Sequence, residues 1–228
     1  MSYVITPPAQ ASVPVAGSED RFPVRRVFCV GRNYAAHARE MGHDPDREPP
    51  FFFMKPADSL VTDGADMPYP PATSDLHHEI ELVVALGSGG KDIPVEKANE
   101  CIWGYAVGLD MTRRDVQGEA KKMGRPWDMG KGFDQSAPIG TMHPVGETGI
   151  IDTGAIWLTV NGETRQTSDI NALIWSVPET ISYLSGLVEL AAGDLIYSGT
   201  PEGVAACVKG DELHGHVDGL SDLTVKIV

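Results

Sequence analysis

The sequence predicts an α+β fold dominated by β structure. Short apolar runs bounded by turn residues outnumber the segments with helical periodicity, and several of these runs follow one another as antiparallel hairpins. Asn161-Gly162, between the runs 156–160 and 163–167, is a strong signal for a two-residue hairpin turn. Strands in this proportion, with a few separate helices, are typical of the α+β class.

The first half of the chain alternates strand-like runs with turns and short helices. Buried strands are expected at 22–30, 51–54 and 79–86, and a central strand at 102–109. Helices are expected at 35–41, where Gly42 ends the pattern, and at 95–100. A third helix is expected to start at Asp110, because acidic and hydroxyl residues fill the turn that follows.

The second half begins with a stretch, 124–134, that holds too many glycines for a regular element and is expected to be a loop around Lys131. A helix is expected to begin at Ser176, where Glu179 completes a capping box. Strands at 195–197 and 223–228 follow. Residues 1–21 contain several prolines and are expected to form a loosely held arm with a short strand at 3–5. Residues 22–228 contain no linker and are expected to form a single domain.

Composition excludes some classes of partner and site. The formal net charge of -14 argues against non-specific binding to nucleic acid or to an anionic membrane. The three cysteines, Cys29, Cys101 and Cys207, match no disulfide framework and no zinc spacing, so reduced thiols in the cytoplasm are expected. Neither a signal peptide nor a membrane-spanning run is recognisable in the sequence.

Glu79 and Glu81 stand two residues apart at the head of an apolar run. On a strand they would share one face, and each charge would raise the pKa of the other carboxyl. A hard divalent cation with oxygen ligands would relieve that repulsion. The alternative, a solvated edge strand with two surface glutamates, stays open for this stretch alone. The adjacent His77 and His78 could suggest zinc, but no second histidine pair at ligand spacing supports it, so a structural role is expected.

Asp110 is the candidate for a third metal ligand. It stands where an apolar strand is expected to meet a helix, a position at which functional residues gather. Three carboxylates would suit Mg²⁺, which keeps coordination positions open for water and substrate. The alternative for Asp110 is a simple helix N-cap.

Three further groups could supply chemistry. His37 and Glu40, three residues apart, could form a base dyad in which the carboxylate orients the imidazole. Lys131 could stabilise a developing oxyanion. Arg113, Arg114 and Gln117 could hold a substrate carboxylate. Solvated helix faces and an ordinary surface lysine are the alternatives.

Together these segments resemble the fumarylacetoacetate hydrolase family. The resemblance rests on the order and spacing of six pieces across residues 27–204. They are Gly31-Arg32-Asn33-Tyr34 with His37 and Glu40, Lys55-Pro56, the run 78–82, the run 108–117, the lysine loop with 136–140, and the run 198–204.

The resemblance implies the mixed β-roll or sandwich of the family's C-terminal domain, here as a single catalytic domain, and a homodimer. It implies Mg²⁺ or Mn²⁺ held by Glu79, Glu81 and Asp110. It assigns the activation of water to His37 and Glu40, and makes Lys131 the catalytic lysine. The substrate contacts that it implies are Arg32, Lys55, Arg114, Gln117 and Thr200.

Within the family the chain is most similar to the compact acylpyruvate branch, and above all to bacterial fumarylpyruvate hydrolases. The implied reaction is hydrolysis of a C–C bond, from fumarylpyruvate to fumarate and pyruvate, a step in gentisate and aromatic breakdown. An oxaloacetate decarboxylase, or a hydroxymuconate-type isomerase or decarboxylase, is the alternative on the same scaffold. Because a decarboxylase needs no attacking water, His37 and Glu40 favour hydrolysis. A non-catalytic metal- or ligand-binding protein is the alternative of another class.

Overall fold

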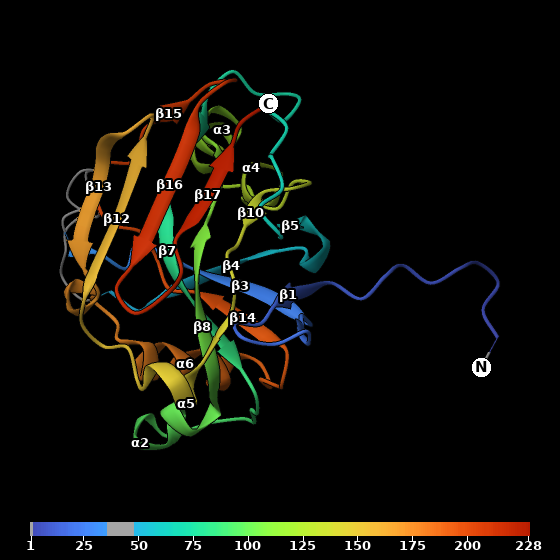
Figure 1. Cartoon of the computed structure of the whole chain (residues 1–228), viewed down its shortest axis with the longest axis vertical. Helices are drawn as coiled ribbons and strands as arrows, with labels where there is room; N and C mark the ends of the chain where they lie inside the picture. The colour runs from blue at the N-terminus through green and yellow to red at the C-terminus, as the bar shows by residue number, and fades with distance from the viewer. Residues whose placement is uncertain (1, 36–47) are drawn as a thin grey trace.

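Two β-sheets packed against one another form the body of the protein in the computed structural model, which describes residues 2–35 and 48–228 (Figure 1). The larger sheet has six strands in the order β11-β8-β7-β14-β3-β4, and only β14 and β3 run parallel. The smaller, antiparallel sheet has the order β13-β12-β16-β17. The predicted β-dominated α+β fold is confirmed.

Strand bounds follow the apolar runs of the sequence closely. The six-stranded sheet consists of β3 (Arg26–Gly31), β4 (Phe51–Lys55), β7 (Ile80–Leu86), β8 (Ile102–Leu109), β11 (His143–Pro144) and β14 (Asp194–Tyr197). The four-stranded sheet consists of β12 (Ala155–Val160), β13 (Glu163–Asp169), β16 (Glu212–Val217) and β17 (Leu223–Lys226). Smaller pairings join β1 (Ser12–Pro14) to β2 (Arg21–Pro23), β5 (Leu60–Val61) to β10 (Ala137–Pro138), and β6 (Leu76–His77) to both β9 (Thr112–Arg113) and β15 (Ala206–Cys207).

The helices are short and lie at the two ends of the sheets (Figure 1). They are α2 (Val95–Ala98), α3 (Arg114–Lys122), α4 (Asp128–Lys131), α5 (Val145–Thr148) and α6 (Val177–Leu187), with 3-10 turns η1 (Ala57–Ser59), η2 (Asn99–Cys101) and η3 (Ile170–Ala172). The predicted capping box of Ser176 and Glu179 begins α6. Among the described helices, none combines the length and the apolar character needed to cross a membrane.

Strand β7 is the centre of the packing because all seven of its residues are buried. Ile80, Leu82 and Val84 point into the core between the two sheets. Val83 on the opposite face joins a second apolar cluster. This second cluster includes Val13 of the β1-β2 hairpin, which covers that face. A strand buried on both faces places any charged side chain it carries inside the protein.

Four expectations from the sequence were wrong in detail. The single strand expected at 22–30 is two strands, β2 and β3, because β2 pairs with β1 while β3 joins the six-stranded sheet. The helix expected to start at Asp110 begins at Arg114, because residues 112–113 first pair with β6 as strand β9. The glycine-rich stretch 124–134 is not all loop, since Trp127 accepts backbone hydrogen bonds from Gly130 and Lys131 and one helical turn, α4, forms. No strand forms at residues 3–5, and the extended segment there projects from the body (Figure 1). The segment expected as an arm joins the body from Ser12 onward.

Gly108 illustrates how tightly the centre of the large sheet is packed. A Cβ atom at Gly108 would lie 2.5 Å from Val83 Cγ2 and 2.7 Å from Tyr197 Cε1. We therefore expect Gly108→Ala to destabilise the protein by about 1–3 kcal/mol, the usual cost of overpacking a core. Urea unfolding would measure this difference. The matched control is Gly118→Ala in α3, where a Cβ meets nothing within 4 Å, and where replacement should stabilise the helix by up to about 1 kcal/mol.

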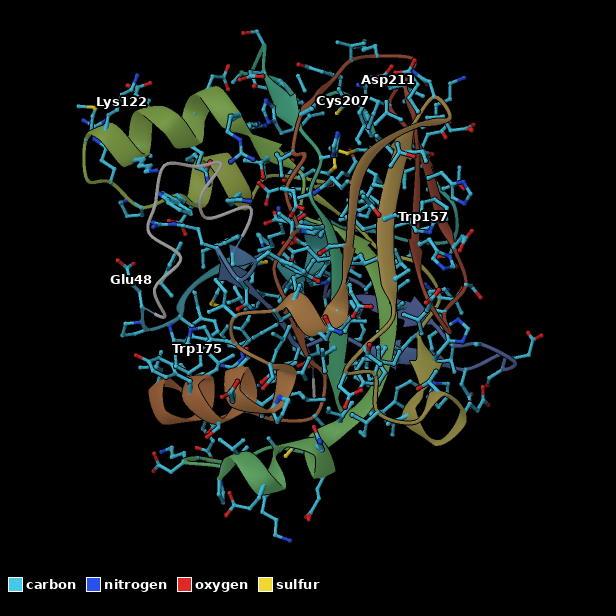
Figure 2. The ribbon with its side chains drawn as sticks, turned by 90° about the vertical axis from the view of Figure 1, so that its left-hand side faces the viewer. Glu48, Lys122, Trp157, Trp175, Cys207 and Asp211 are labelled. Carbon is cyan, nitrogen blue, oxygen red and sulfur yellow. The ribbon has the colours of Figure 1, made fainter. Side chains whose placement is uncertain are left out.

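The outer face of the four-stranded sheet carries a cluster of histidine and aspartate. His216 Nδ1 lies 2.6 Å from Asp222 Oδ1, and His216 Nε2 lies 3.0 Å from Asp218 Oδ1. The His216 ring stacks on Trp157, labelled in Figure 2, at a centroid distance of 4.8 Å. Burial opposes the charged ring, but hydrogen bonds to the two aspartates outweigh burial and raise the pKa of His216. The hydrogen bond from Ala155 N and the one with His216 lower the pKa of Asp218.

These opposite shifts predict how the cluster stabilises the fold as a function of pH. The stabilisation from His216 is complete below the unfolded pKa of about 6.5 and is lost as pH rises through the raised pKa in the folded protein. His216→Gln should therefore lower the free energy of unfolding more at pH 6 than at pH 9. Urea titrations of both proteins at the two pH values would measure this difference. An equal loss of unfolding free energy at both pH values would contradict the raised pKa of His216.

Candidate active site

The paired glutamates and Asp110 meet at the ends of neighbouring strands. Glu81 lies on β7 directly opposite Gly108 of β8, and Glu79 immediately precedes β7. Asp110 immediately follows β8, and its backbone N–H donates to Glu79 O at 2.9 Å. The β7-β8 register therefore brings three carboxylates together that are 31 residues apart at most in the sequence.

This carboxylate triad is buried and its geometry fits a divalent cation. Glu79, Glu81 and Asp110 are 5%, 1% and 0% exposed, which rules out a solvated edge strand. Each offers one oxygen, and these oxygens lie within 4.8 Å of one another. Three oxygen ligands of this charge suit Mg²⁺ or Mn²⁺. The triad is the one such grouping of possible metal ligands in residues 2–35 and 48–228.

The electrostatics of the triad also call for a cation. Burial, then the nearby charges of Asp110 and Glu79, raise the pKa of Glu81 well above its ordinary value. The backbone N–H of Gly199 donates to Glu81 Oε2 at 2.8 Å and offsets only part of this shift. A carboxylate held in such a place is stabilised in its charged form by a positive partner.

Lys131 reaches the triad from the end of α4. Its Nζ donates to Glu79 Oε2 at 2.8 Å and to Asp110 Oδ2 at 2.6 Å. Burial alone would lower the pKa of Lys131, but the charges of Asp110 and Glu79 outweigh burial and raise it. The two carboxylates therefore favour the charged form of Lys131, which suits the predicted role in oxyanion stabilisation.

Lys55 lies beneath the triad and is itself 1% exposed. Its Nζ lies 2.8 Å from Asp110 Oδ1, and it donates to the backbone oxygens of Met111 and Lys131. These contacts tie the strand end that carries Asp110 to the turn that carries Lys131. The residue is absent from the lining of the cavity above the triad, so its geometry favours support of Asp110 over contact with a substrate.

Helix α3 supplies a second positive group. The Arg114 guanidinium pairs with Glu79 Oε1 and donates to Gln117 Oε1 at 2.6 Å. Arg114 and Gln117 are three residues apart on the helix, so both face the triad. Lys121, one further turn along, lines the same cavity. Lys121 was not predicted from the sequence, although its spacing of four residues from Gln117 places it on the same helix face.

A cavity opens above the triad and gathers most of the predicted site. It is lined by the triad members Glu79 and Glu81, by Val30, Gly31, Arg32, Phe53, Arg114, Gln117, Lys121, Trp127 and Lys131, and by Thr200. Trp127 packs edge-on against Phe51 at a centroid distance of 5.2 Å and forms an aromatic wall of the cavity, which was not predicted from the sequence. Arg32, at φ 56°, stacks its guanidinium over the same Phe51 ring. His37 and Glu40, the predicted base dyad, lie outside the described residues.

The neighbouring histidines have other partners than a metal. His77 Nε2 lies 2.8 Å from Asp75 Oδ1, and His78 Nδ1 lies 3.0 Å from Gln166 Oε1. Neither histidine belongs to the grouping of possible metal ligands found in the described part of the chain. The structural role expected for both histidines agrees with these contacts.

Comparison with known proteins agrees with this geometry. The family model for the fumarylacetoacetate (FAA) hydrolase C-terminal region matches residues 26–228. The chain is 45% identical to a fumarylpyruvate hydrolase of a Ralstonia species, over 82% of this chain and 98% of the relative. It is 40% identical to the mitochondrial oxaloacetate tautomerase FAHD1 of Homo sapiens, over 89% of this chain and 91% of the relative.

A solved structure is also very similar. The crystal structure of fumarylpyruvate hydrolase from Pseudomonas aeruginosa, in complex with Mn²⁺ and pyruvate, superposes with a TM-score of 0.98 at 56% identity. The superposition covers 100% of this chain and 99% of the other. The matched sequence, the fold and the buried acidic site all lead to the same assignment. The chain belongs to the fumarylacetoacetate hydrolase family.

Proposed function

We propose that this protein is a divalent-metal-dependent hydrolase that cleaves a C–C bond of an acylpyruvate. Fumarylpyruvate is the proposed substrate, and fumarate and pyruvate are the products. One observation carries the proposal: two members of the buried triad, Glu79 and Glu81, line one cavity together with a lysine, an arginine and a threonine hydroxyl. The relatives named fumarylpyruvate hydrolase, at 45% and 56% identity, support the choice of substrate.

Glu79, Glu81 and Asp110 would hold the cation. Bound there, Mg²⁺ or Mn²⁺ would supply Lewis acidity that polarises an oxygen of the 2-oxo acid. Arg114 and Thr200 offer N–H and O–H donors from two sides of the same cavity, which suits a carboxylate. These residues would orient the substrate with its distal carbonyl toward Lys131.

The remaining steps are proton transfers and charge stabilisation by side chains. His37, oriented by Glu40, would remove a proton from the water that attacks the distal carbonyl carbon. An ammonium has three N–H donors, and Lys131 gives two of them to Glu79 and Asp110. The third can donate to the oxyanion that forms on the attacked carbonyl. The C–C bond then breaks, the water oxygen stays with the released acid, and a proton returns to the pyruvate carbon.

An absorbance assay tests this proposal directly. Purified protein with Mg²⁺ or Mn²⁺ should remove the conjugated diketone absorbance of fumarylpyruvate and release one pyruvate for each substrate consumed. A chelator should abolish the reaction and added metal should restore it. Intact metal binding without turnover of any 2-oxo acid would support a non-catalytic binding protein instead.

Oxaloacetate is the substrate of the second candidate function, which the relatives named oxaloacetate tautomerase favour. The same preparation should be assayed with oxaloacetate. Pyruvate formed from oxaloacetate but not from fumarylpyruvate would replace the hydrolase proposal by decarboxylation. Interconversion of enol and keto oxaloacetate, without release of pyruvate, would replace it by tautomerisation.

We further propose that residues 22–228 act as a single catalytic domain within a cytoplasmic homodimer. The three cysteines are buried and unpaired, which suits a reducing compartment. The family match over residues 26–228 supports one catalytic unit. Light scattering after size-exclusion chromatography should give twice the 24.5 kDa mass of the chain.

A further inference from the structure

Gln166 is a buried polar residue that does not line the cavity above the triad. It lies on β13, and it is 1% exposed although residues 163–165 before it are exposed. Its side chain turns inward, toward the start of β7 and the turn after β14. Buried amides of this kind require hydrogen-bond partners, and the identity of those partners shows what the amide does.

The Gln166 amide makes four hydrogen bonds. Its Oε1 accepts from Ile80 N at 3.1 Å and lies 3.0 Å from His78 Nδ1. Its Nε2 donates to Thr200 Oγ1 at 2.8 Å and to Pro201 O at 2.8 Å. One amide therefore connects the residues on both sides of the metal ligand Glu79 to the turn that carries Thr200.

Two backbone groups settle which way the amide faces. The oxygen and nitrogen of a glutamine side chain are distinguished by their partners. Ile80 N–H can only donate, so the atom facing it is Oε1. Pro201 O can only accept, so the atom facing it is Nε2. The amide nitrogen must then donate to the Thr200 hydroxyl.

This bond fixes the role of the Thr200 hydroxyl. A hydroxyl has one proton to donate, and Thr200 already accepts a proton from Gln166. Within residues 2–35 and 48–228, Thr200 has no hydrogen-bond acceptor of its own for that proton. Thr200 lines the cavity above the triad, so its proton is available to an acceptor bound there. A carboxylate oxygen accepts without donating and is the partner that fits.

We propose that Gln166 is a positioning residue that sets the Thr200 hydroxyl as a donor to the substrate carboxylate. This inference rests on the proposed function. By joining Thr200 to His78 and Ile80, Gln166 also holds the carboxylate subsite at a constant distance from the metal ligand Glu79.

Gln166→Glu is the sharpest test. The introduced carboxylate matches the shape of glutamine and can still accept from Ile80 N and His78, but it cannot donate to Thr200. It would instead accept the Thr200 proton and leave no donor for the substrate. We expect the KM for fumarylpyruvate and the Kd of oxalate for the Mn²⁺-loaded protein to rise about 10- to 100-fold, the range for losing a hydrogen bond to a charged group. The kcat and the Kd of Mn²⁺ itself should change by less than about three-fold.

The control is a double-mutant cycle with Thr200→Val. Thr200→Val alone should raise the Kd of oxalate by a similar factor, and adding Gln166→Glu should raise it little further. If the double mutant raised the Kd of oxalate by the product of the two single-mutant factors, the two residues would act independently and the proposal would be overturned. A loss of Mn²⁺ affinity or of kcat as large as the change in KM would also overturn it. If Gln166→Glu does not fold, the same constants should be measured for Gln166→Met, which removes the donor to Thr200 without burying a charge. A wild type that binds oxalate but leaves fumarylpyruvate intact would refute the proposed substrate, while the oxalate measurements would still decide on Gln166.

Discussion

Glu81→Gln should abolish tight metal binding and with it the proposed activity. The substitution keeps the shape of the side chain, and the amide oxygen can still accept from Gly199 N, so the turn after β14 is retained. It removes one of the three charged side chains that we propose as metal ligands. Since even partners outside the ligand set cost 10- to 100-fold in metal affinity when mutated, we expect a loss of at least about 100-fold. Calorimetric titration with MnCl₂ would measure it.

The same substitution should stabilise the metal-free protein. Burial and the charges of Asp110 and Glu79 raise the pKa of Glu81, so ionised Glu81 destabilises the fold above its ordinary titration range. A neutral amide removes that penalty, and the metal-free variant should melt at a higher temperature than the metal-free wild type at pH 7. Glu119→Gln, an exposed change on α3, is the control and should alter neither property. A variant that loses both metal affinity and stability would show that Glu81 has a structural role instead.

Lys131→Met should lower kcat by about 100- to 1,000-fold, the usual effect of removing one donor to an oxyanion. Metal affinity should stay the same or increase. The reason is that the Lys131 ammonium already neutralises Glu79 and Asp110, at 2.8 and 2.6 Å, and competes with any cation for their charge. Single-turnover assays with fumarylpyruvate and titration with MnCl₂ would separate the two effects.

Lys122→Met is the matched control for Lys131, because Lys122 is exposed at the end of α3 (Figure 2). It should leave kcat and metal affinity unchanged. If Lys131→Met weakened Mn²⁺ binding as strongly as Glu81→Gln does, Lys131 would be a support of the triad and not a donor to the substrate.

Local sequence signals predicted the elements whose hydrogen bonds are local. Asn161 and Gly162 adopt positive φ values of 52° and 81°, as a tight hairpin turn requires. The capping box of Ser176 and Glu179 was correct because both partners lie within one helical turn. The helix start at Asp110 was predicted wrongly. The polar residues after Asp110 satisfied the local rule for a helix start, but pairing with β6, some 35 residues earlier, holds residues 112–113 in a strand.

The site was predictable to the extent that its residues stand at strand ends and on one helix face. The acidic group could be predicted because its members, Glu79, Glu81 and Asp110, stand beside apolar runs. The β7-β8 register brings the three together. Lys55 and Gln166 were different. Nothing in the sequence around Lys55 shows that it contacts Asp110, and nothing around Gln166 shows that it reaches Thr200. Lys55 lies on β4 of the six-stranded sheet and Gln166 on β13 of the four-stranded sheet, so both contacts depend on how the chain folds.

The fold class, the family and the composition of the acidic site were all predictable from the amino-acid sequence. These depend on periodicity, turn chemistry and motif order, which are properties of neighbouring residues. The packed sheets were needed to show that Glu81 is buried, that Lys131 lies between two carboxylates, and that Gln166 donates a hydrogen bond to Thr200. Burial and hydrogen bonding between distant strands depend on how the sheets pack, and pairwise contacts across packed layers are not encoded in any single stretch of the chain.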